Sequence, residues 1–256
     1  MKYYEQLVDL QCFTKADVVN LVGNPRTATS LLLDYQKRSL IESVKRNLYV
    51  AISLETKQSI ANRFLIGSKV TDDAYITHHS AFEYYGYSNQ VFNELYISGD
   101  KRFNPFQYDG FTYRYLAPRI QEGVDVKLDG IHVTDIERTV LDSINDFEKV
   151  AGLEELLRCL ELIPYVDEEK LLVYLGSINK QVLYQKTGYI LEHYKNELRL
   201  SDLFFDTCKK SAINSVRYLY NGIQNEPKFF NSYWNLIVPR DLMMRMSKTG
   251  EANGTL

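Results

Sequence analysis

The alternation of hydrophobic and polar positions over residues 14–52 predicts two short helices, a tight turn between them, and a two-stranded hairpin. Thr14 is typical of a helix cap, and Asp17 three residues later completes a capping box. Gly23 is typical of a helix end because glycine tolerates positive φ. Asn24 is a typical cap for a second helix that begins at once. The first ten residues predict one more helix in front of this pair.

The second helix of this pair has an apolar face and a polar, basic face. The inward positions follow helical spacing and are Ala28, Leu31, Leu32 and Tyr35. The outward face carries Arg26, Ser30, Leu33 and Lys37, flanked by Thr27 and Thr29, and Arg38 follows the helix. Such a face suits the DNA major groove, because arginine can bond guanine, hydroxyls reach bases or phosphates, and the helix N-terminus favours phosphate.

The hairpin after this helix carries two cations at its tip. Residues 40–44 and 48–52 alternate as strands with one buried face, and Lys45 and Arg46 lie in the loop between them. Helices followed by a basic hairpin predict a winged helix-turn-helix, with these two cations on the DNA backbone. Two alternatives remain: a small helical subdomain with a solvated basic loop, and a protein-interaction module of the same fold.

The pattern beyond the hairpin predicts a second domain of α+β class. Dipeptides of Asp-Gly type at 109–110 and 129–130 predict hairpins within a mostly antiparallel sheet, and helical periodicity dominates after residue 147 as a C-terminal helical lobe. The last helices are expected over 201–220 and 242–246. The predicted organisation is a winged helix-turn-helix at 1–55, a helical connector at 56–69, an α+β domain at 70–247 and a disordered tail at 248–256.

Charge is unevenly distributed along the chain. Residues 24–52 hold five Lys and Arg against two Asp and Glu, whereas residues 56–180 hold thirteen against twenty. The positive field is therefore local to the proposed DNA face, and the acidic middle region should repel nucleic acid. The helical lobe is locally basic and could face either flanking DNA or solvent, through Lys180, Lys186, Lys195, Arg199, Lys209, Lys210 and Arg217.

The remaining composition indicates a reduced, cytoplasmic protein. The three cysteines and four histidines show no zinc-ligand spacing and no disulfide framework, so we expect no metal. Apolar runs fall short of the ~20 residues of a membrane helix, so we expect no membrane partner. We find no phosphate-binding loop and no dinucleotide fingerprint, and we expect no cofactor.

Three segments of the chain together resemble a known family. They are Leu40 to Tyr49 (LIESVKRNLY), Tyr75 to Gly86 (YITHHSAFEYYG) and Val133 to Asp142 (VTDIERTVLD). In this order they resemble AbiEi-type antitoxins of the bacterial abortive-infection (AbiE) toxin–antitoxin systems. Asn47 stands where that family favours glycine, and asparagine also tolerates positive φ. The part beyond about Phe147 matches by order and length only.

The resemblance implies two roles. The N-terminal domain would bind inverted repeats in double-stranded DNA of its own promoter and repress the operon. The C-terminal domain would neutralise a nucleotidyltransferase-like toxin encoded next to it, and whether the two form a stable complex is left open. A third reading is an interaction protein that binds the toxin without binding DNA.

An enzymatic alternative comes from the tripeptide Asp125-Val126-Lys127. An acid, a lysine two residues later and a further acid such as Asp109 or Glu122 are typical of the metal site of restriction-like nucleases. Such tripeptides are frequent by chance, so the structural reading as a solvated hairpin is favoured over a nuclease.

Two polar motifs receive structural interpretations. In His78-His79-Ser80 we expect Ser80 or His79 to cap the following helix rather than to act in catalysis. Thr134 and Glu137 predict a capping box. Asp135 and Arg138 are then left for an i, i+3 ion pair, or for an exposed surface used in antitoxicity.

Overall fold

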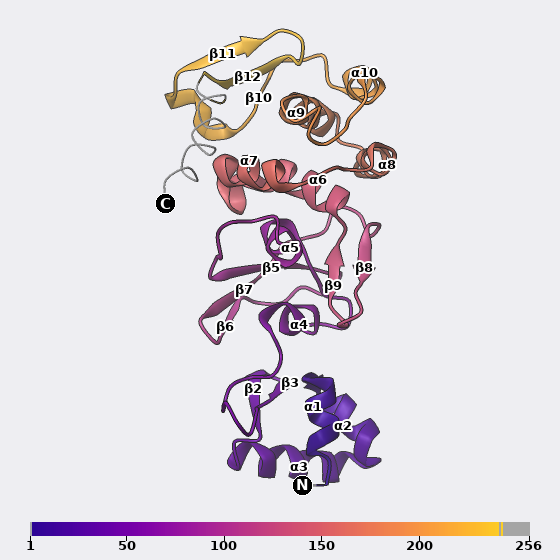
Figure 1. The fold of residues 1–256 in the computed structure, drawn as a ribbon, viewed down its shortest axis with the longest axis vertical. Helices are drawn as coiled ribbons and strands as arrows, with labels where there is room; N and C mark the ends of the chain where they lie inside the picture. The colour runs from indigo at the N-terminus through magenta and orange to yellow at the C-terminus, as the bar shows by residue number, and fades with distance from the viewer. Residues whose placement is uncertain (1, 241, 243–256) are drawn as a thin grey trace. The chain divides into compact units, whose positions relative to one another are not determined.

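A computed structural model of the chain describes residues 2–240 and residue 242 (Figure 1). The structure is of mixed α+β class, with helices and three sheets whose pairings are mostly antiparallel. The chain divides into two compact units. The first unit comprises Met1–Ile76, Phe92–Pro118 and Asp125–Val133. The second unit comprises Thr77–Val91, Arg119–Val124 and Thr134–Leu256.

The first unit begins with a module of helices and a hairpin, residues 2–52, which we call the N-terminal module. Its elements are α1 (Tyr4–Leu10), β1 (Cys12–Thr14), α2 (Lys15–Val22), α3 (Pro25–Lys37), β2 (Ile41–Lys45) and β3 (Leu48–Ala51). The three strands form an antiparallel sheet in the order β1-β3-β2. In Figure 1, α3 lies beside the β2–β3 hairpin, as their contacts require.

The local signals of the module act as predicted. The Thr14 side chain accepts the N–H of Asp17 and the Asp17 side chain accepts the N–H of Thr14, which completes the capping box of α2. Gly23 ends α2 with φ of 75°. Asn24 then caps α3, and Asn47 takes φ of 67° in the hairpin loop. Each of these residues either accepts a backbone N–H of a neighbour within three residues or lets the backbone turn at its own position.

The core of the module explains which face of α3 remains for solvent. Ala28, Leu32 and Tyr35 are buried, as helical spacing predicts. They belong to a cluster that includes Leu7 on α1 and Ile41 on β2. Because this face of α3 is fixed against the module, the opposite face carries the polar side chains outward.

The first unit also contains a six-stranded mixed sheet. Its strands are β4 (Tyr75–Ile76), β5 (Glu94–Ser98), β6 (Phe106–Tyr108), β7 (Phe111–Tyr115), β8 (Val124–Val126) and β9 (His132–Thr134). Helix α4 (Arg63–Ser68) packs against β4 and β5. The strand order is β6-β7-β5-β4-β9-β8. The β4–β5 and β6–β7 pairs are antiparallel, whereas β5–β7 and β4–β9 are parallel, which the hairpin signals alone did not indicate.

The predicted connector helix is shorter than the sequence suggested. An antiparallel bridge between Ile52 and Ser59 holds the chain after the hairpin, so helix α4 begins only at Arg63 after its cap, Asn62. Gly67 lets this helix approach the sheet closely, since a Cβ there would lie 2.6 Å from Cδ1 of Ile76.

The second unit is mainly helical and carries a small sheet. Its helices are α5 (His78–Tyr85), α6 (Ile136–Asp146), α7 (Gly152–Leu162), α8 (Glu168–Ile178), α9 (Gln181–Glu192) and α10 (Asp202–Ser211), with 3-10 turns at Phe147–Lys149 and Asn221–Asn225. The small sheet contains β10 (Arg217–Tyr218), β11 (Lys228–Asn231) and β12 (Leu236–Pro239), in the order β10-β12-β11.

The prediction of one helix over 201–220 is wrong. Helix α10 ends at Ser211, and the chain becomes extended at Ala212 with ψ of 154°. Strand β10 then pairs in parallel with β12, about twenty residues later in the sequence, so a distant partner overrides the local periodicity. The predicted tail at 248–256 and all but Leu242 of the predicted helix at 242–246 lie outside the described residues.

The core of the second unit closes around Trp234. Its ring is fully buried, and its Nε1 donates to Oε2 of Glu192 at 2.8 Å. Gly188 on α9 makes room for the ring, because a Cβ there would lie 2.1 Å from Cη2 of Trp234. None of the helices in the described part of the chain is long and apolar enough to cross a membrane.

We predict that Gly188→Ala destabilises the protein by about 1–3 kcal/mol, because the indole must move from its position. Gly176→Ala on α8 is the matched control, since the nearest atom to its Cβ would be the Tyr184 hydroxyl at 3.9 Å. The control should be unchanged or more stable by about 0.5–1 kcal/mol. Denaturant unfolding followed by fluorescence of Trp234, the single tryptophan, measures both. Equal midpoints for Gly188→Ala and the wild type would contradict this account of the core.

Candidate functional site

The exposed face of α3 presents the polar residues that the sequence selected. Arg26, Thr27, Thr29, Ser30 and Lys37 are all exposed. The hydroxyl of Thr29 donates to the carbonyl of Pro25 at 2.9 Å, which orients its methyl group and leaves its oxygen able to accept. Leu33 is 64% exposed between the polar positions and adds an apolar contact to the face.

The N-terminus of α3 keeps its positive end free of carboxylates. The Oδ1 of Asn24 accepts the N–H groups of Arg26 at 2.9 Å and Thr27 at 3.1 Å. This cap is uncharged, and the first turn of α3 carries no acidic residue. The helix dipole is therefore not neutralised by the protein itself, and an anion is favoured at this end.

The C-terminal end of α3 adds two exposed cations. Lys37 is exposed, and Arg38 follows as the C-terminal cap residue. Arg38 forms an ion pair with Asp34 at 3.2 Å, in which both side chains are about half exposed. Exposed pairs of this kind contribute little stability, so the guanidinium can exchange the carboxylate for a phosphate at small cost.

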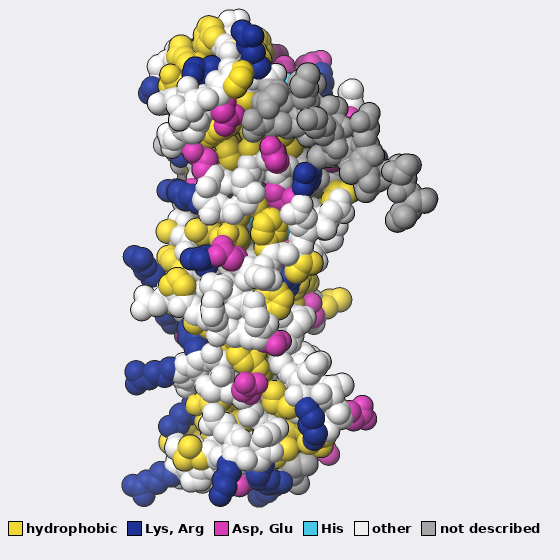
Figure 2. Space-filling view, turned by 90° about the vertical axis from the view of Figure 1, so that its left-hand side faces the viewer, with side chains coloured by type: hydrophobic (Ala, Val, Ile, Leu, Met, Phe, Trp, Pro, Cys, Tyr) yellow, Lys and Arg dark blue, Asp and Glu magenta, His cyan; other side chains and the backbone are white. Residues whose placement is uncertain are grey.

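Of the two cations at the hairpin tip, Lys45 is partly buried against the protein and Arg46 is exposed to solvent. The Nζ of Lys45 donates to the carbonyl of Val70 at 3.1 Å and lies 5.2 Å and 5.4 Å from the ring centroids of Phe103 and Phe106. Burial lowers the pKa of Lys45. Lys45 is thus turned towards the sheet of the first unit, away from the predicted backbone contact, and Arg46 is the exposed cation of the loop. Figure 2 shows Lys and Arg side chains projecting from the N-terminal module.

The structure does not assemble the residues of the nuclease alternative. Lys127 and Asp125 are paired with each other at 2.7 Å, and the Asp125 side chain is 48% exposed. Asp109 lies in the β6–β7 turn with φ of 49°, whereas Asp125 lies on β8. Strands β6 and β8 form opposite edges of the six-stranded sheet, so the two acids cannot share a metal ion.

The start of α6 is capped differently from the prediction. Asp135, not Thr134, is the N-cap, and its carboxylate accepts the N–H of Arg138 at 2.9 Å. The hydroxyl of Thr134 instead lies 2.7 Å from that of Thr139, and both are buried. The Glu137 carboxylate accepts the N–H of Asp167 at 2.8 Å, so the predicted capping box is wrong.

Arg138 is fully buried and cannot belong to an exposed antitoxicity surface. Its Nε donates to Asp142 at 2.8 Å, four residues later, and its Nη1 donates to the carbonyl of Glu122 at 2.6 Å. The predicted i, i+3 partner, Asp135, receives the hydroxyl of Tyr174 at 2.7 Å instead. Arg138 therefore pairs with the acid four residues after it and not with the acid three residues before it, and the ion pair lies inside the core.

The histidine pair also has a different environment from the predicted cap. Thr77 occupies the N-cap of α5 without a side-chain cap bond, and Ser80 is fully buried within the helix. His79 lies between two carboxylates: its Nδ1 is 2.9 Å from Glu83 and its Nε2 is 3.1 Å from Glu155. The sequence signal that could have revealed this cluster is the i, i+4 spacing of His79 with Glu83 on one helix and of Glu155 with Cys159 on another, since all four can bind a metal ion.

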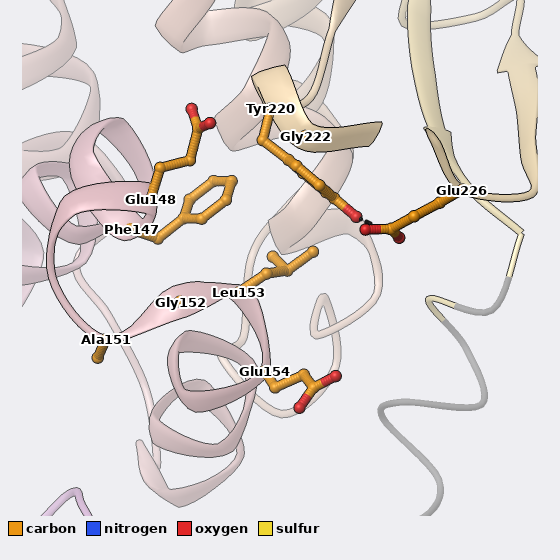
Figure 3. Close-up of a pocket in the computed structure, with 9 residues that line it drawn as sticks. All are labelled: Phe147, Glu148, Ala151, Gly152, Leu153, Glu154, Tyr220, Gly222 and Glu226. Carbon is orange, nitrogen blue, oxygen red and sulfur yellow. Dashed lines mark hydrogen bonds between the residues drawn. The ribbon is translucent and has the colours of Figure 1, made fainter. Parts of the chain in front are cut away.

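An open pocket in the second unit is lined by aromatic rings and glutamates (Figure 3). It has a volume of about 400 Å³ and includes Glu148, Glu154 and Glu226. The Tyr220 hydroxyl donates to Glu226 at 2.8 Å, and its ring lies edge-on to Phe147 at 6.0 Å. Because the charged groups of its lining are carboxylates, the pocket disfavours phosphate and does not extend the candidate nucleic-acid face.

Several cations of the helical lobe are engaged within the second unit. The ammonium of Lys186 lies 5.5 Å from the Phe147 ring centroid. Lys195 is paired with Asp202, and Lys209 donates to the carbonyl of Tyr233. Arg199, Lys210 and Arg217 are exposed, so the unit's own groups occupy only part of the basic surface of the lobe.

Comparison with known proteins supports the fold alone. No protein-family model matches the chain, and a search of curated proteins found no similar sequence. Among solved structures, the chain is similar to the RV2827C protein from Mycobacterium tuberculosis, with a TM-score of 0.66 at 11% sequence identity. The similarity covers 98% of this chain and 96% of that one. The fold of this chain thus occurs in a solved protein of very different sequence.

We predict that Arg138→Met lowers the free energy of unfolding by about 3–5 kcal/mol, because Asp142 is left as a buried charge without its partner. The double variant Arg138→Met with Asp142→Leu should recover most of this loss. Denaturant unfolding of the single and double variants measures the coupling. Equal stability of the two variants would show that the ion pair is not the source of the effect.

Proposed function

We propose that this protein is a winged helix-turn-helix repressor and an antitoxin of the AbiEi type. The observation that carries the DNA-binding part is the exposed polar face of α3, which starts at an uncharged cap and adjoins a hairpin with an exposed arginine. The order of three helices and an antiparallel three-stranded sheet in the N-terminal module supports the winged-helix interpretation. In this proposal α3 is the recognition helix and the β2–β3 hairpin is the wing.

Each exposed residue of the module then has a role defined by its chemistry. Arg26, in the first turn of α3, reaches the edge of a guanine with its forked guanidinium. Thr27, Thr29 and Ser30 offer short hydroxyl groups to bases or phosphates. Lys37 and Arg38 bind phosphates at the far end of the helix, and Arg46 binds the sugar-phosphate backbone from the wing.

The antitoxin part of the proposal rests on the resemblance of three sequence segments to the AbiEi family. In this proposal the protein acts in the cytoplasm, binds inverted repeats in its own promoter and represses its operon. Neutralisation of a nucleotidyltransferase-like toxin belongs to the residues after the N-terminal module. A toxin-binding protein without DNA binding is the competing outcome of the experiments below.

We predict that Arg26→Ala weakens binding to the upstream DNA of its own gene by about 1–3 kcal/mol, with a smaller loss on a scrambled duplex. Fluorescence anisotropy with the full-length protein, repeated over a salt series, measures both affinities. Lys210→Ala is the matched control, because it removes one exposed cation from α10 and should leave both affinities unchanged.

The pattern of losses separates the alternatives. Equal losses for Arg26→Ala on both duplexes would make Arg26 a phosphate contact rather than a base reader. Equal losses for Arg26→Ala and Lys210→Ala would mean that only total charge matters. A wild-type protein that binds both duplexes weakly and alike would overturn the repressor proposal.

We predict opposite results for the two cations of the wing. Arg46→Ala should weaken binding to native and scrambled DNA equally and reduce the salt slope by about one, as a lost phosphate contact does. Lys45→Ala should leave DNA affinity unchanged and lower stability by about 1–2 kcal/mol, because its bonds lie within the protein. Anisotropy and thermal unfolding distinguish them, and a Lys45→Ala protein with native stability and weakened DNA binding would reverse the assignment.

A further inference from the structure

Two helices of the second unit place a buried set of metal-ligand side chains against one another. Helix α5 contributes His79 and Glu83, and helix α7 contributes Glu155 and Cys159. Each pair is spaced i, i+4, so each pair lies on one face of its helix. The side chains of His79 and Glu155 are 3% and 5% exposed, and Cys159 is fully buried.

The distances among three of these donors fit a small tetrahedral ion. Nε2 of His79 lies 3.1 Å from Oε1 of Glu155, and Sγ of Cys159 lies 3.7 Å from the same oxygen. All three donor atoms are within 4.8 Å of one another. Zinc–ligand bonds of about 2.0–2.3 Å in a tetrahedron separate the ligands by roughly 3.3–3.8 Å, so small side-chain movements suffice.

The other ring nitrogen of His79 is held as in known metal sites. Nδ1 is 2.9 Å from the Glu83 carboxylate, which is itself only 4% exposed. A ligating histidine characteristically donates this second N–H to a carboxylate, which fixes the orientation of the ring while Nε2 binds the metal. The hydroxyl of Ser88 lies 3.1 Å from both Nε2 of His79 and Oε1 of Glu155. Its oxygen is therefore close enough to the donor atoms of His79 and Glu155 to act as a fourth ligand.

Two features indicate that the hydrogen bonds within the cluster do not use all of its donor atoms or fill all of its space. Oε2 of Glu155 is buried without a hydrogen-bond partner among the described residues, and its ion-pair partner Arg158 is 3.8 Å away. A cavity of about 10 Å³, room for roughly one water molecule, adjoins both His79 and Cys159. The second carboxylate oxygen is available to an incoming ion, and the cavity, which Glu155 does not line, gives the side chains of His79 and Cys159 room to adjust.

The charges around the cluster favour a cation. Two buried carboxylates, Glu83 and Glu155, lie beside His79, and the Cys159 thiol would bind a metal as the thiolate after losing its proton.

We propose that His79, Glu155 and Cys159 form a binding site for a divalent cation of the zinc class, with Ser88 beside it, that ties α5 to α7. Imidazole and thiolate select zinc or cobalt over magnesium and calcium, which require oxygen ligands. Structural zinc sites are closed by four protein ligands, whereas three ligands and an open position are typical of catalytic sites, so in this proposal the Ser88 hydroxyl is the fourth donor that closes a stabilising site. The site goes beyond the proposed DNA binding and does not depend on it.

The test is a titration of the reduced, chelator-treated full-length protein with Co²⁺, followed by competition with Zn²⁺. We expect one ion per chain, visible bands of tetrahedral cobalt and a thiolate-to-cobalt charge-transfer band in the near ultraviolet. Native mass spectrometry with Zn²⁺ should show the mass of one metal minus two protons. Zn²⁺ should also raise the thermal unfolding midpoint.

Cys159→Ser should lose the charge-transfer band and weaken binding at least tenfold, whereas Cys208→Ser should behave as the wild type. Cys208 is the matched control because it is also fully buried in a helix of the same unit. Glu83→Gln should keep the bands and weaken binding roughly 10- to 100-fold, as loss of an orienting partner does. Absence of one-to-one binding by folded wild-type protein, or an unchanged charge-transfer band in Cys159→Ser, would overturn the proposal.

Discussion

The second unit depends on one fully buried guanidinium. A buried charge is tolerated only when it is paired, and Arg138 is paired with Asp142 on its own helix and bonded to the carbonyl of Glu122 before the helix, while its Nη2 has no hydrogen-bond partner among the described residues. Helix α6 is thereby fixed to the segment 119–124. Gly123 completes the arrangement with φ of 76°, because a Cβ there would lie 3.0 Å from Cβ of Arg138. The polar side of α6 is thus as much a part of the core as its apolar side.

The N-terminal module follows the opposite arrangement. Its core is apolar, and the polar side chains of α3 face outward, where Thr29 and Arg38 form bonds only with their own helix. Asn24 satisfies two backbone donors of α3 without adding charge, which keeps the helix end attractive to an anion. Exposed, unmatched polar groups on a rigid element are suited to a partner, and buried, matched ones are suited to stability.

The sequence was sufficient for the local signals of the N-terminal module: Thr14 and Asp17, Gly23 and Asn47 all act within a few residues, and the structure has each as predicted. It was wrong about the equally local capping box at Thr134 and Glu137. It did not identify distant partners: Val70 for Lys45 lies 25 residues away, and Glu155 for His79 lies 76 residues away. Periodicity indicates that a side chain faces inward but does not identify the side chain that it meets.

The proposed DNA binding uses exposed residues of the N-terminal module, and the proposed metal site uses buried residues of the second unit, so the two share no residue. Residues 24–52 hold five cations against two acids, and four of the five cations, all except Lys45, are exposed on the N-terminal module. In the second unit the cations Lys186, Lys195 and Lys209 are held by the unit's own groups, and its open pocket is acidic. Phosphate is therefore favoured at the module and disfavoured at the pocket. In the proposal, the second unit contacts a protein partner and not DNA. An ion at the buried cluster would stiffen that unit by joining α5 to α7, and a rigid scaffold is what a surface that acts on a protein partner requires.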